Sequence, residues 1–115
     1  MRDITKLFKA VSDPNRLRIL KMLEVKPLCV CEITEALQLA TSTVSKHLSI
    51  LRDAGFIIDL KNGKWVNYTL HPENRAAVLF PILSDWLKTD STVQSDLDNL
   101  KKIDRNELCK LSSIS

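Results

Sequence analysis

The chain has 115 residues, of which 44% are hydrophobic and 27% are charged. These values are typical of one soluble globular domain and exclude a second domain. The net charge of +3 is compatible with a nucleic-acid partner but too small to argue for one. The sequence lacks eighteen consecutive apolar residues and a signal peptide, so we expect a cytoplasmic protein that does not contact the membrane.

Two helices are predicted at the start of the chain. Apolar residues recur at helical spacing from Ile4 to Val11. Ser12-Asp13-Pro14 then supplies a stop, an N-cap candidate and a proline at the first position of a second helix, which should end at Lys26-Pro27. A chain this small buries a limited part of its surface, so a helical fold often completes its core with a second copy. We therefore expect a dimer.

A helix-turn-helix is predicted next. The helical period continues from Val30 to Leu37, stops at 38–41 and resumes from Val44 to Leu51. Two short helices joined by a tight turn form this unit. Gly55 follows the second helix, where a left-handed C-cap is expected.

A β-hairpin should follow, because Asn62-Gly63 separates two β-prone runs, 56–60 and 65–70. Both turn residues tolerate positive φ, which makes this pair a strong hairpin signal. Apolar residues from Ala77 to Leu87 predict another helix, entered near Asn74 and bent by Pro81.

Beyond this helix, 90–103 has spacing that could extend it, and 104–115 is expected to be a C-terminal tail that can fray. The predicted fold class is mainly α with a small β-hairpin. In chain order it is a winged helix-turn-helix of the form ααααββα, which occupies residues 1–103 and carries both the DNA-binding and the dimerisation surface.

The outer face of the second helix of this unit carries hydroxyl and basic side chains, because Val44 and Leu48 face inward. Recognition helices place N-terminal residues against base edges, and short hydroxyls allow a close approach. Lysines there and on the hairpin suit phosphates. The alternative is that these residues are solvated or capping groups, and that His47 packs or caps. The candidate DNA-binding residues are Thr41, Ser42, Thr43, Ser45, Lys46 and His47 on the helix, with Lys61, Asn62 and Lys64 on the hairpin.

Four stretches carry a resemblance to a known family: 8–20 (FKAVSDPNRLRIL), 28–33 (LCVCEI), 42–55 and 63–70 (GKWVNYTL). Together they resemble the ArsR/SmtB family of bacterial metal-responsive repressors. The resemblance implies a homodimer built from the first and last long helices. It also implies recognition helices in successive major grooves of a palindromic operator, with half-sites about 34 to 36 Å apart. Family members often have Ser where Ala40 stands, so we expect Thr41 to start the recognition helix.

The cysteines point to a soft ligand. Cys29 and Cys31 lie at the N-terminal edge of a helix, where backbone amides and the helix dipole favour thiolate. Three cysteines do not make a disulfide framework. The alternative is that both side chains simply pack. Because the pair resembles the arsenic-responsive branch, we expect trivalent arsenic, as arsenite or methylarsenite, to be the inducer.

Two features of this pair matter for mechanism. Residues i and i+2 of a regular helix point about 200° apart, so one ion can reach both sulfurs only if the first turn distorts. Arsenic-responsive relatives also commonly carry a third cysteine where Thr34 stands. The missing sulfur could come from Cys109 of either subunit or from a small thiol, or the ligand could be an organoarsenical that needs only two. Cys109 could equally be an idle thiol.

Other functions are disfavoured. Ala76 to Lys102 contains no histidine, unlike the zinc-sensing branch, and no cysteine precedes Cys29, unlike cadmium and lead sensors. Two rivals stay open: a thiol-based redox or other soft-metal sensor of the same fold, and a metal-independent module for protein contacts. An enzyme is not expected, because no nucleophile, histidine and acid combine plausibly and no glycine-rich phosphate loop exists.

Overall fold

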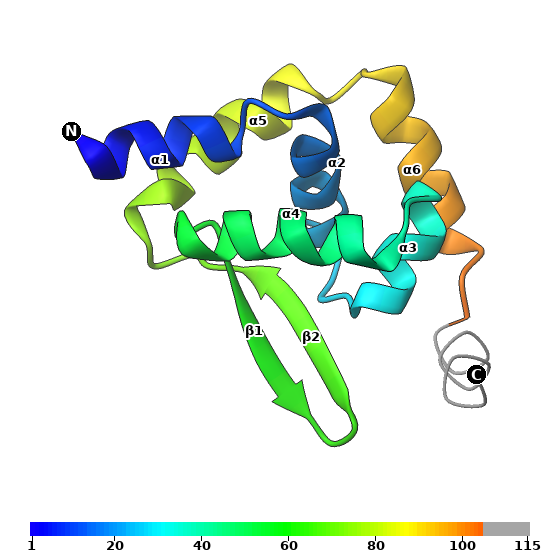
Figure 1. Ribbon diagram of the computed structural model, residues 1–115. Helices are drawn as coiled ribbons and strands as arrows, with labels where there is room; N and C mark the ends of the chain where they lie inside the picture. Colours follow the sequence, from blue (N-terminus) through cyan, green and yellow to red (C-terminus); the bar gives the residue numbers. More distant parts are fainter. Residues whose placement is uncertain (105–115) are drawn as a thin grey trace.

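The computed structural model describes residues 1–104. Its helices form one body from which a β-hairpin projects (Figure 1). The elements are α1 (Arg2–Ala10), α2 (Pro14–Leu23), α3 (Val30–Leu37), α4 (Thr41–Asp53), β1 (Ile57–Asn62), β2 (Trp65–Leu70), the 3₁₀ helix η1 (Arg75–Leu79), α5 (Phe80–Trp86) and α6 (Ser91–Lys101). This architecture confirms the predicted fold class. Within the described range, no helix has the length and apolar character needed to cross a membrane.

Helix α2 lies at the centre of the body and packs against α4, α6 and β2. It begins where the sequence predicts, because the Asp13 carboxylate accepts hydrogen bonds from the amides of Asn15 (2.8 Å) and Arg16 (3.1 Å), and Pro14 occupies the first helical position. Its apolar face supplies much of the hydrophobic core. The buried α2 residues of that core are Ile19, Leu20, Met22 and Leu23.

The turn between α3 and α4 depends on one unusual residue. Gln38 closes α3 with φ 56° and ψ 44°, a left-handed conformation, and its amide donates to the Thr34 carbonyl at 2.9 Å. A non-glycine residue adopts this conformation at a small cost in energy. The turn brings the inner face of α4 onto α3, and Val44, Leu48 and Leu51 are buried there. The predicted inner face of the recognition helix is confirmed.

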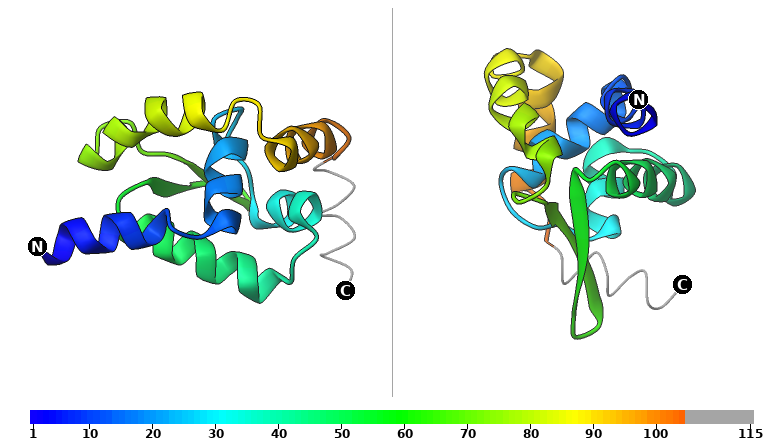
Figure 2. Two further views of the ribbon diagram at one scale, coloured as in Figure 1. Left: turned by 90° about the horizontal axis from the view of Figure 1, so that it is seen from above. Right: turned by 90° about the vertical axis from the view of Figure 1, so that its left-hand side faces the viewer.

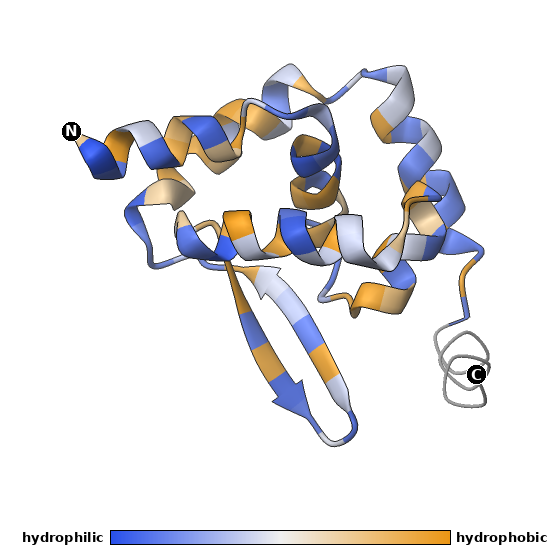
Figure 3. Cartoon of the chain, in the orientation of Figure 1, coloured by the Kyte–Doolittle hydropathy of each residue, from blue (hydrophilic) through white to orange (hydrophobic). Residues whose placement is uncertain are grey.

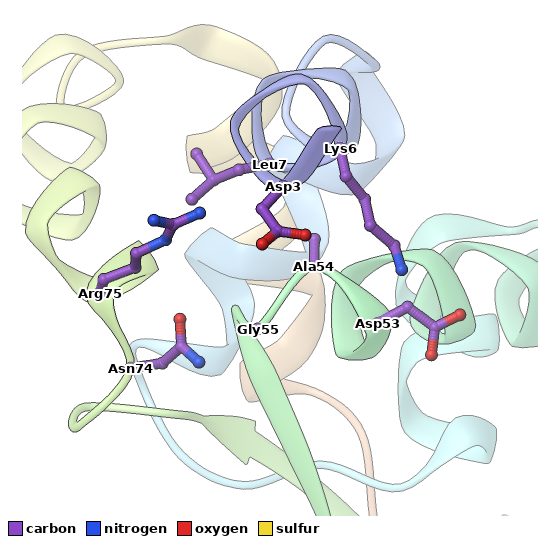
Figure 4. A pocket seen from close by; sticks show the side chains of 8 residues that line it. All are labelled: Asp3, Lys6, Leu7, Asp53, Ala54, Gly55, Asn74 and Arg75. Carbon is purple, nitrogen blue, oxygen red and sulfur yellow. The ribbon is translucent and has the colours of Figure 1, made fainter. Parts of the chain in front are cut away.

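The end of α4 is a glycine-dependent cap, as predicted. Gly55 has φ +92°, and its amide bonds to Arg52 while the Phe56 amide bonds to Leu51, the two bonds of a Schellman motif. A Cβ at Gly55 would lie 2.6 Å from the side-chain oxygen of Asn74, so glycine is required for space as well as for φ. Gly55 and Asn74 both line a cavity of about 260 Å³ between α1, α4 and Asn74-Arg75 (Figure 4).

The hairpin turn differs from the prediction by one residue. Asn62 pairs with Trp65, so the two turn residues are Gly63 and Lys64. Of these two, only Gly63 has positive φ (+62°). The expectation that Asn62 also sits in the turn is therefore wrong. The register is set by the strand pairs, and one residue with positive φ is enough to reverse the chain.

The predicted final helix is divided into three pieces. Asn74 caps η1, Pro81 lies in the first turn of α5, and Asp90 caps α6 by accepting from the Val93 amide at 3.0 Å. Pro81 therefore begins a helix and does not bend one, because it has no amide to donate within a helix interior. Helix α6 is a separate element that turns back onto α2 and α3 (Figure 2).

A buried ion pair holds α6 in place. Both nitrogens Nε and Nη2 of Arg18 donate to the Asp96 carboxylate, each at 2.8 Å, and Nη1 donates to the side-chain oxygen of Asn15 at 2.9 Å. Asp96 is only 3% exposed. The hydrogen bond to Asp96 raises the pKa of Arg18 above its usual value, with burial opposing and the Asp96 charge adding to it. This bidentate geometry is the strong form of a charged pair.

We expect Asp96→Ala to lower the free energy of unfolding by about 2 to 3 kcal/mol, because it leaves a partly buried guanidinium without its carboxylate. Urea unfolding followed by circular dichroism measures the change. Asp98→Ala is the matched control, since Asp98 is exposed on the same helix and should change stability by less than about 0.5 kcal/mol. Equal effects of the two substitutions would contradict the assigned role of the pair.

Candidate nucleic-acid interface and thiol site

The outer face of α4 presents the residues that the sequence predicts for DNA contact. Thr41, Ser42, Thr43, Ser45 and Lys46 are all exposed on its first two turns. Helix α4 begins at Thr41, as expected, and its N-cap is Ala40, which makes no side-chain cap hydrogen bond. Alanine cannot accept from the first amides of the helix. The first amides of α4 therefore receive no side-chain cap from this position.

His47 differs from the other helix candidates because it is only partly exposed. Its Nδ1 lies 3.2 Å from Nη1 of Arg16. The His47 ring therefore contacts Arg16 of α2 on one side and lies at the edge of the outer face of α4 on the other.

The hairpin carries the remaining DNA candidates at its tip. Lys61, Asn62 and Lys64 are exposed, and the ammonium of Lys64 lies 5.1 Å from the centre of the Trp65 ring. A cation over an aromatic face is held without losing its charge. The hairpin projects from the body on the same side as α4 (Figure 1). The structure thus groups all nine predicted residues on two neighbouring elements.

The thiol site lies where α3 begins. Cys29 is the N-cap residue, with φ −89° and ψ 167°, and Cys31 is the second helical residue. Both are thiols, but Cys29 is only 5% exposed whereas Cys31 is partly exposed. A cysteine at the N-cap places its sulfur where Ser or Asp usually stands.

A capping box surrounds Cys29. Its amide donates to the Glu32 carboxylate at 3.0 Å, and the Glu32 amide in turn donates to the Cys29 side chain. The Glu32 side chain is 2% exposed, so the carboxylate is buried beside the thiol. The first turn of α3 is therefore closed by the backbone amide and the side chain of Cys29 together with Glu32.

The structure corrects the geometric expectation for the two cysteines. Separation by 200° applies to two positions on a regular helix, but Cys29 has extended dihedral angles and lies outside the helix. The approach of its sulfur to that of Cys31 is controlled by the cap and not by helical twist.

Thr34 is already engaged within the helix, since its hydroxyl donates to the Val30 carbonyl at 2.7 Å. Cys109 lies outside the described residues. Among residues 1–104, three or more His, Cys, Asp or Glu side chains do not gather into a group able to hold a metal ion. The described part of the site therefore supplies two sulfurs.

The segment before the thiol site is bound to the hairpin. Leu28 pairs with Tyr68 of β2 through two backbone hydrogen bonds, of 3.0 Å and 2.7 Å. Residue 28 thus connects to the hairpin while residue 29 caps α3. The amino-acid sequence does not indicate this bridge, because a single residue pair has no periodic signal.

Two further residues were missed. Glu32 could have been recognised, because an acidic residue three positions after an N-cap is the signature of a capping box. Arg16 carries no local signal, since its partner His47 lies 31 residues away.

Apolar side chains are exposed on α1 and on the η1–α5 segment, which lie at the same end of the molecule (Figures 1 and 3). Large exposed apolar patches mark interaction surfaces. The residues and their exposed fractions are Ile4 50%, Phe8 57%, Val78 73%, Ile82 41% and Trp86 76%.

Helices α3 and α4, followed in the chain by the β1–β2 hairpin, define a winged helix-turn-helix protein. A family model described as "Bacterial regulatory protein, arsR family" matches residues 13–59. The chain is 38% identical over 97 residues to an arsenical resistance operon repressor of Escherichia coli, covering 84% of this chain and 83% of that protein. The chain therefore belongs to the ArsR/SmtB family of metal-responsive transcriptional repressors.

Other relatives extend the comparison. A cadmium resistance regulatory protein, a CadC homologue of Staphylococcus aureus, is 38% identical over 73 residues, covering 63% of this chain and 60% of its own. Reduced HlyU of Vibrio cholerae superposes with a TM-score of 0.65 at 32% identity, covering 74% of this chain and 88% of that one. A homodimeric winged helix-turn-helix domain of Mycobacterium bovis shares the fold, with a TM-score of 0.67 at 23% identity over 78% of this chain and 82% of that one.

Proposed function

We propose that this protein is an arsenic-responsive repressor that releases its operator when trivalent arsenic binds Cys29 and Cys31. One observation carries the proposal: both sulfurs belong to the cap and first turn of α3, the helix on which the recognition helix packs. The arsenical resistance repressor of E. coli supports the choice of ligand. Trivalent arsenic prefers sulfur, and these are the two thiols of the described chain.

The capping box supplies a route from ligand to DNA. A bond between arsenic and the Cys29 sulfur competes with the contact between that side chain and the Glu32 amide. Losing an N-cap costs about 0.5 to 2 kcal/mol. The coupling free energy between an effector site and a DNA site is typically about 1 to 3 kcal/mol. The free energy lost with this cap alone is therefore comparable to a typical coupling free energy. By reciprocity, operator DNA should weaken arsenic binding to the same extent.

A second route leads to the hairpin. Leu28 cannot shift with Cys29 without straining its two hydrogen bonds to Tyr68 of β2. Capture of arsenic therefore acts on both DNA-contacting elements, through α3 on one side and β2 on the other. We assign Ser42, Thr43 and Ser45 to base edges, and Lys46, Lys61 and Lys64 to phosphates.

We assign Thr41, His47 and Asn62 to the edges of the same surface. Their positions on α4 and at the hairpin tip place them beside the residues named above. Hydroxyl, imidazole and amide groups bind either phosphate or base edges.

The active form is proposed to be a homodimer on double-stranded DNA. The exposed apolar residues of α1 and α5 need a cover, and a second copy of the chain supplies a matching apolar surface around a two-fold axis. The homodimeric M. bovis domain has the same fold.

Cys109 is the proposed third sulfur. Helix α6 packs on α3, and Ile103, just beyond α6, packs against the core. Cys109 follows Ile103 by six residues, and six residues of extended chain span at most about 20 Å. The segment that carries Cys109 is therefore attached to the fold close to α3, the helix that begins at the cysteine pair. Completion by a small thiol, or a methylated arsenical with two bonds to sulfur, is the alternative.

A cadmium sensor is the second candidate, because the CadC homologue is also 38% identical. Cadmium prefers four ligands, whereas residues 1–104 hold no group of three or more. A redox sensor of the same fold is the other alternative, and excess reductant in the assay separates it.

We expect Cys29→Ser and Cys31→Ser each to abolish release of the operator by arsenite while changing DNA affinity less than about threefold. Serine keeps the cap or helix position but does not bind arsenic with comparable strength. The measurement is a mobility-shift assay on the protein's own promoter region in excess reductant, with arsenite, methylarsenite, cadmium and zinc. Loss of DNA binding in the absence of metal would assign these cysteines to packing.

Cys109→Ser should weaken the response to arsenite about tenfold or more and leave the response to methylarsenite unchanged, because only arsenite requires a third sulfur. Titration of operator release with each arsenical measures this. If the variant responded to arsenite at the same concentration as the wild type, Cys109 would not be a ligand.

Replacing Lys61 and Lys64 together by alanine should reduce the magnitude of the slope of log affinity against log salt by about 3 to 4, because the homodimer then loses four phosphate contacts and each contributes about 0.9. Fluorescence anisotropy with labelled operator at several salt concentrations gives this slope. The control is the double variant Lys88→Ala/Lys101→Ala, which removes two exposed lysines outside α4 and the hairpin. A similar slope change in the control would mean that overall charge, and not hairpin contact, is responsible.

A further inference from the structure

Arg16 connects three elements through one side chain. Its Nε donates to the Ala10 carbonyl at 2.7 Å, and Nη2 donates to the Lys9 carbonyl at 3.2 Å, both at the end of α1. Its third nitrogen, Nη1, lies 3.2 Å from Nδ1 of His47 in the middle of α4. Arg16 itself stands in the first turn of α2.

This geometry selects one form of the histidine. A guanidinium is always protonated and can only donate, so Nδ1 of His47 must accept. An imidazole that accepts at Nδ1 is neutral and carries its proton on Nε2. The recognition helix then presents an N–H donor at the other side of the ring.

We propose that Arg16 is a positioning residue for operator recognition, which fixes His47 as the Nε2–H tautomer and anchors α4 to the end of α1. Nε2–H then donates to an acceptor on the operator, a phosphate oxygen or a base edge. The inference rests on operator binding by α4, and it is independent of the identity of the inducer and of the thiol site.

The arrangement favours a pre-organised donor. A partly buried ring held at one nitrogen has already lost rotamer freedom, so less entropy is lost when DNA binds. Two of the three Arg16 bonds close the carbonyl end of α1, so the guanidinium is oriented before the ring is placed. Lysine cannot reproduce this, because its ammonium lacks the planar fork.

The tautomer is tested directly in the unmodified protein. Long-range proton–nitrogen NMR correlations of the histidine rings should show a non-protonated Nδ1 and a protonated Nε2 for His47. Arg16→Met should convert this to the averaged pattern of two exchanging tautomers, with His71 as internal reference. A protonated Nδ1 in the wild type would overturn the proposal.

Operator binding tests the functional part. We expect Arg16→Met and His47→Phe each to weaken affinity about tenfold, and the double variant to be no weaker than either single one, because Arg16 acts through His47. Arg16→Lys should behave like Arg16→Met. Arg75→Met, the loss of an exposed arginine on η1, is the control and should stay within twofold.

Two outcomes would contradict the proposal. Additive losses in the double variant would mean that Arg16 and His47 act separately. A salt slope reduced in magnitude by about 2 in Arg16→Met, one contact for each protomer of the homodimer, would mean that Arg16 contacts a phosphate itself. Circular dichroism and the thermal midpoint of each variant establish that it is folded, and the NMR measurement on the wild type decides the tautomer whether or not the variants fold.

Discussion

The pairing of Leu28 with Tyr68 determines where the thiol site sits. Two backbone hydrogen bonds fix residue 28 against the hairpin, and the next residue must therefore leave in an extended conformation and cap α3. The position of α3 in turn sets that of α4, because a turn of three residues connects the two helices and they pack against each other. One short stretch of backbone thus connects the sulfur atoms, the recognition helix and the hairpin.

Much of the fold could be predicted from the sequence where local signals agree with tertiary packing. Helices α2, α3 and α4 were predicted closely because an apolar period is bounded by strong local caps, the Asp13 carboxylate at one end and Gly55 at the other. Prediction was less exact beyond residue 70. The Arg18–Asp96 pair joins residues 78 apart, and no periodicity reveals that α6 must turn back to satisfy it.

The candidate site shows the same division. Cysteines one residue apart and hydroxyls on a helix face are visible as spacing. Cys29 is the cap and not a helical residue, and it directly follows Leu28, which pairs with Tyr68; spacing along the sequence does not describe such a pairing. The link from Arg16 to His47 is equally invisible, because both residues look like ordinary surface polar residues until the fold brings them together.

The unequal exposure of the two sulfurs imposes an order on capture in the proposed mechanism. Cys31 is accessible and Cys29 is 5% exposed, so a thiol-seeking molecule attaches to Cys31 first and reaches Cys29 only when the first turn opens. A reagent able to form one bond to sulfur remains on Cys31 and leaves the cap of α3 intact. Only a molecule that can form a second bond to sulfur goes on to bind Cys29. Under the proposed mechanism, the start of α3 therefore selects ligands by their number of bonds to sulfur, and it distinguishes an ion that binds two thiols from the many electrophiles that modify one.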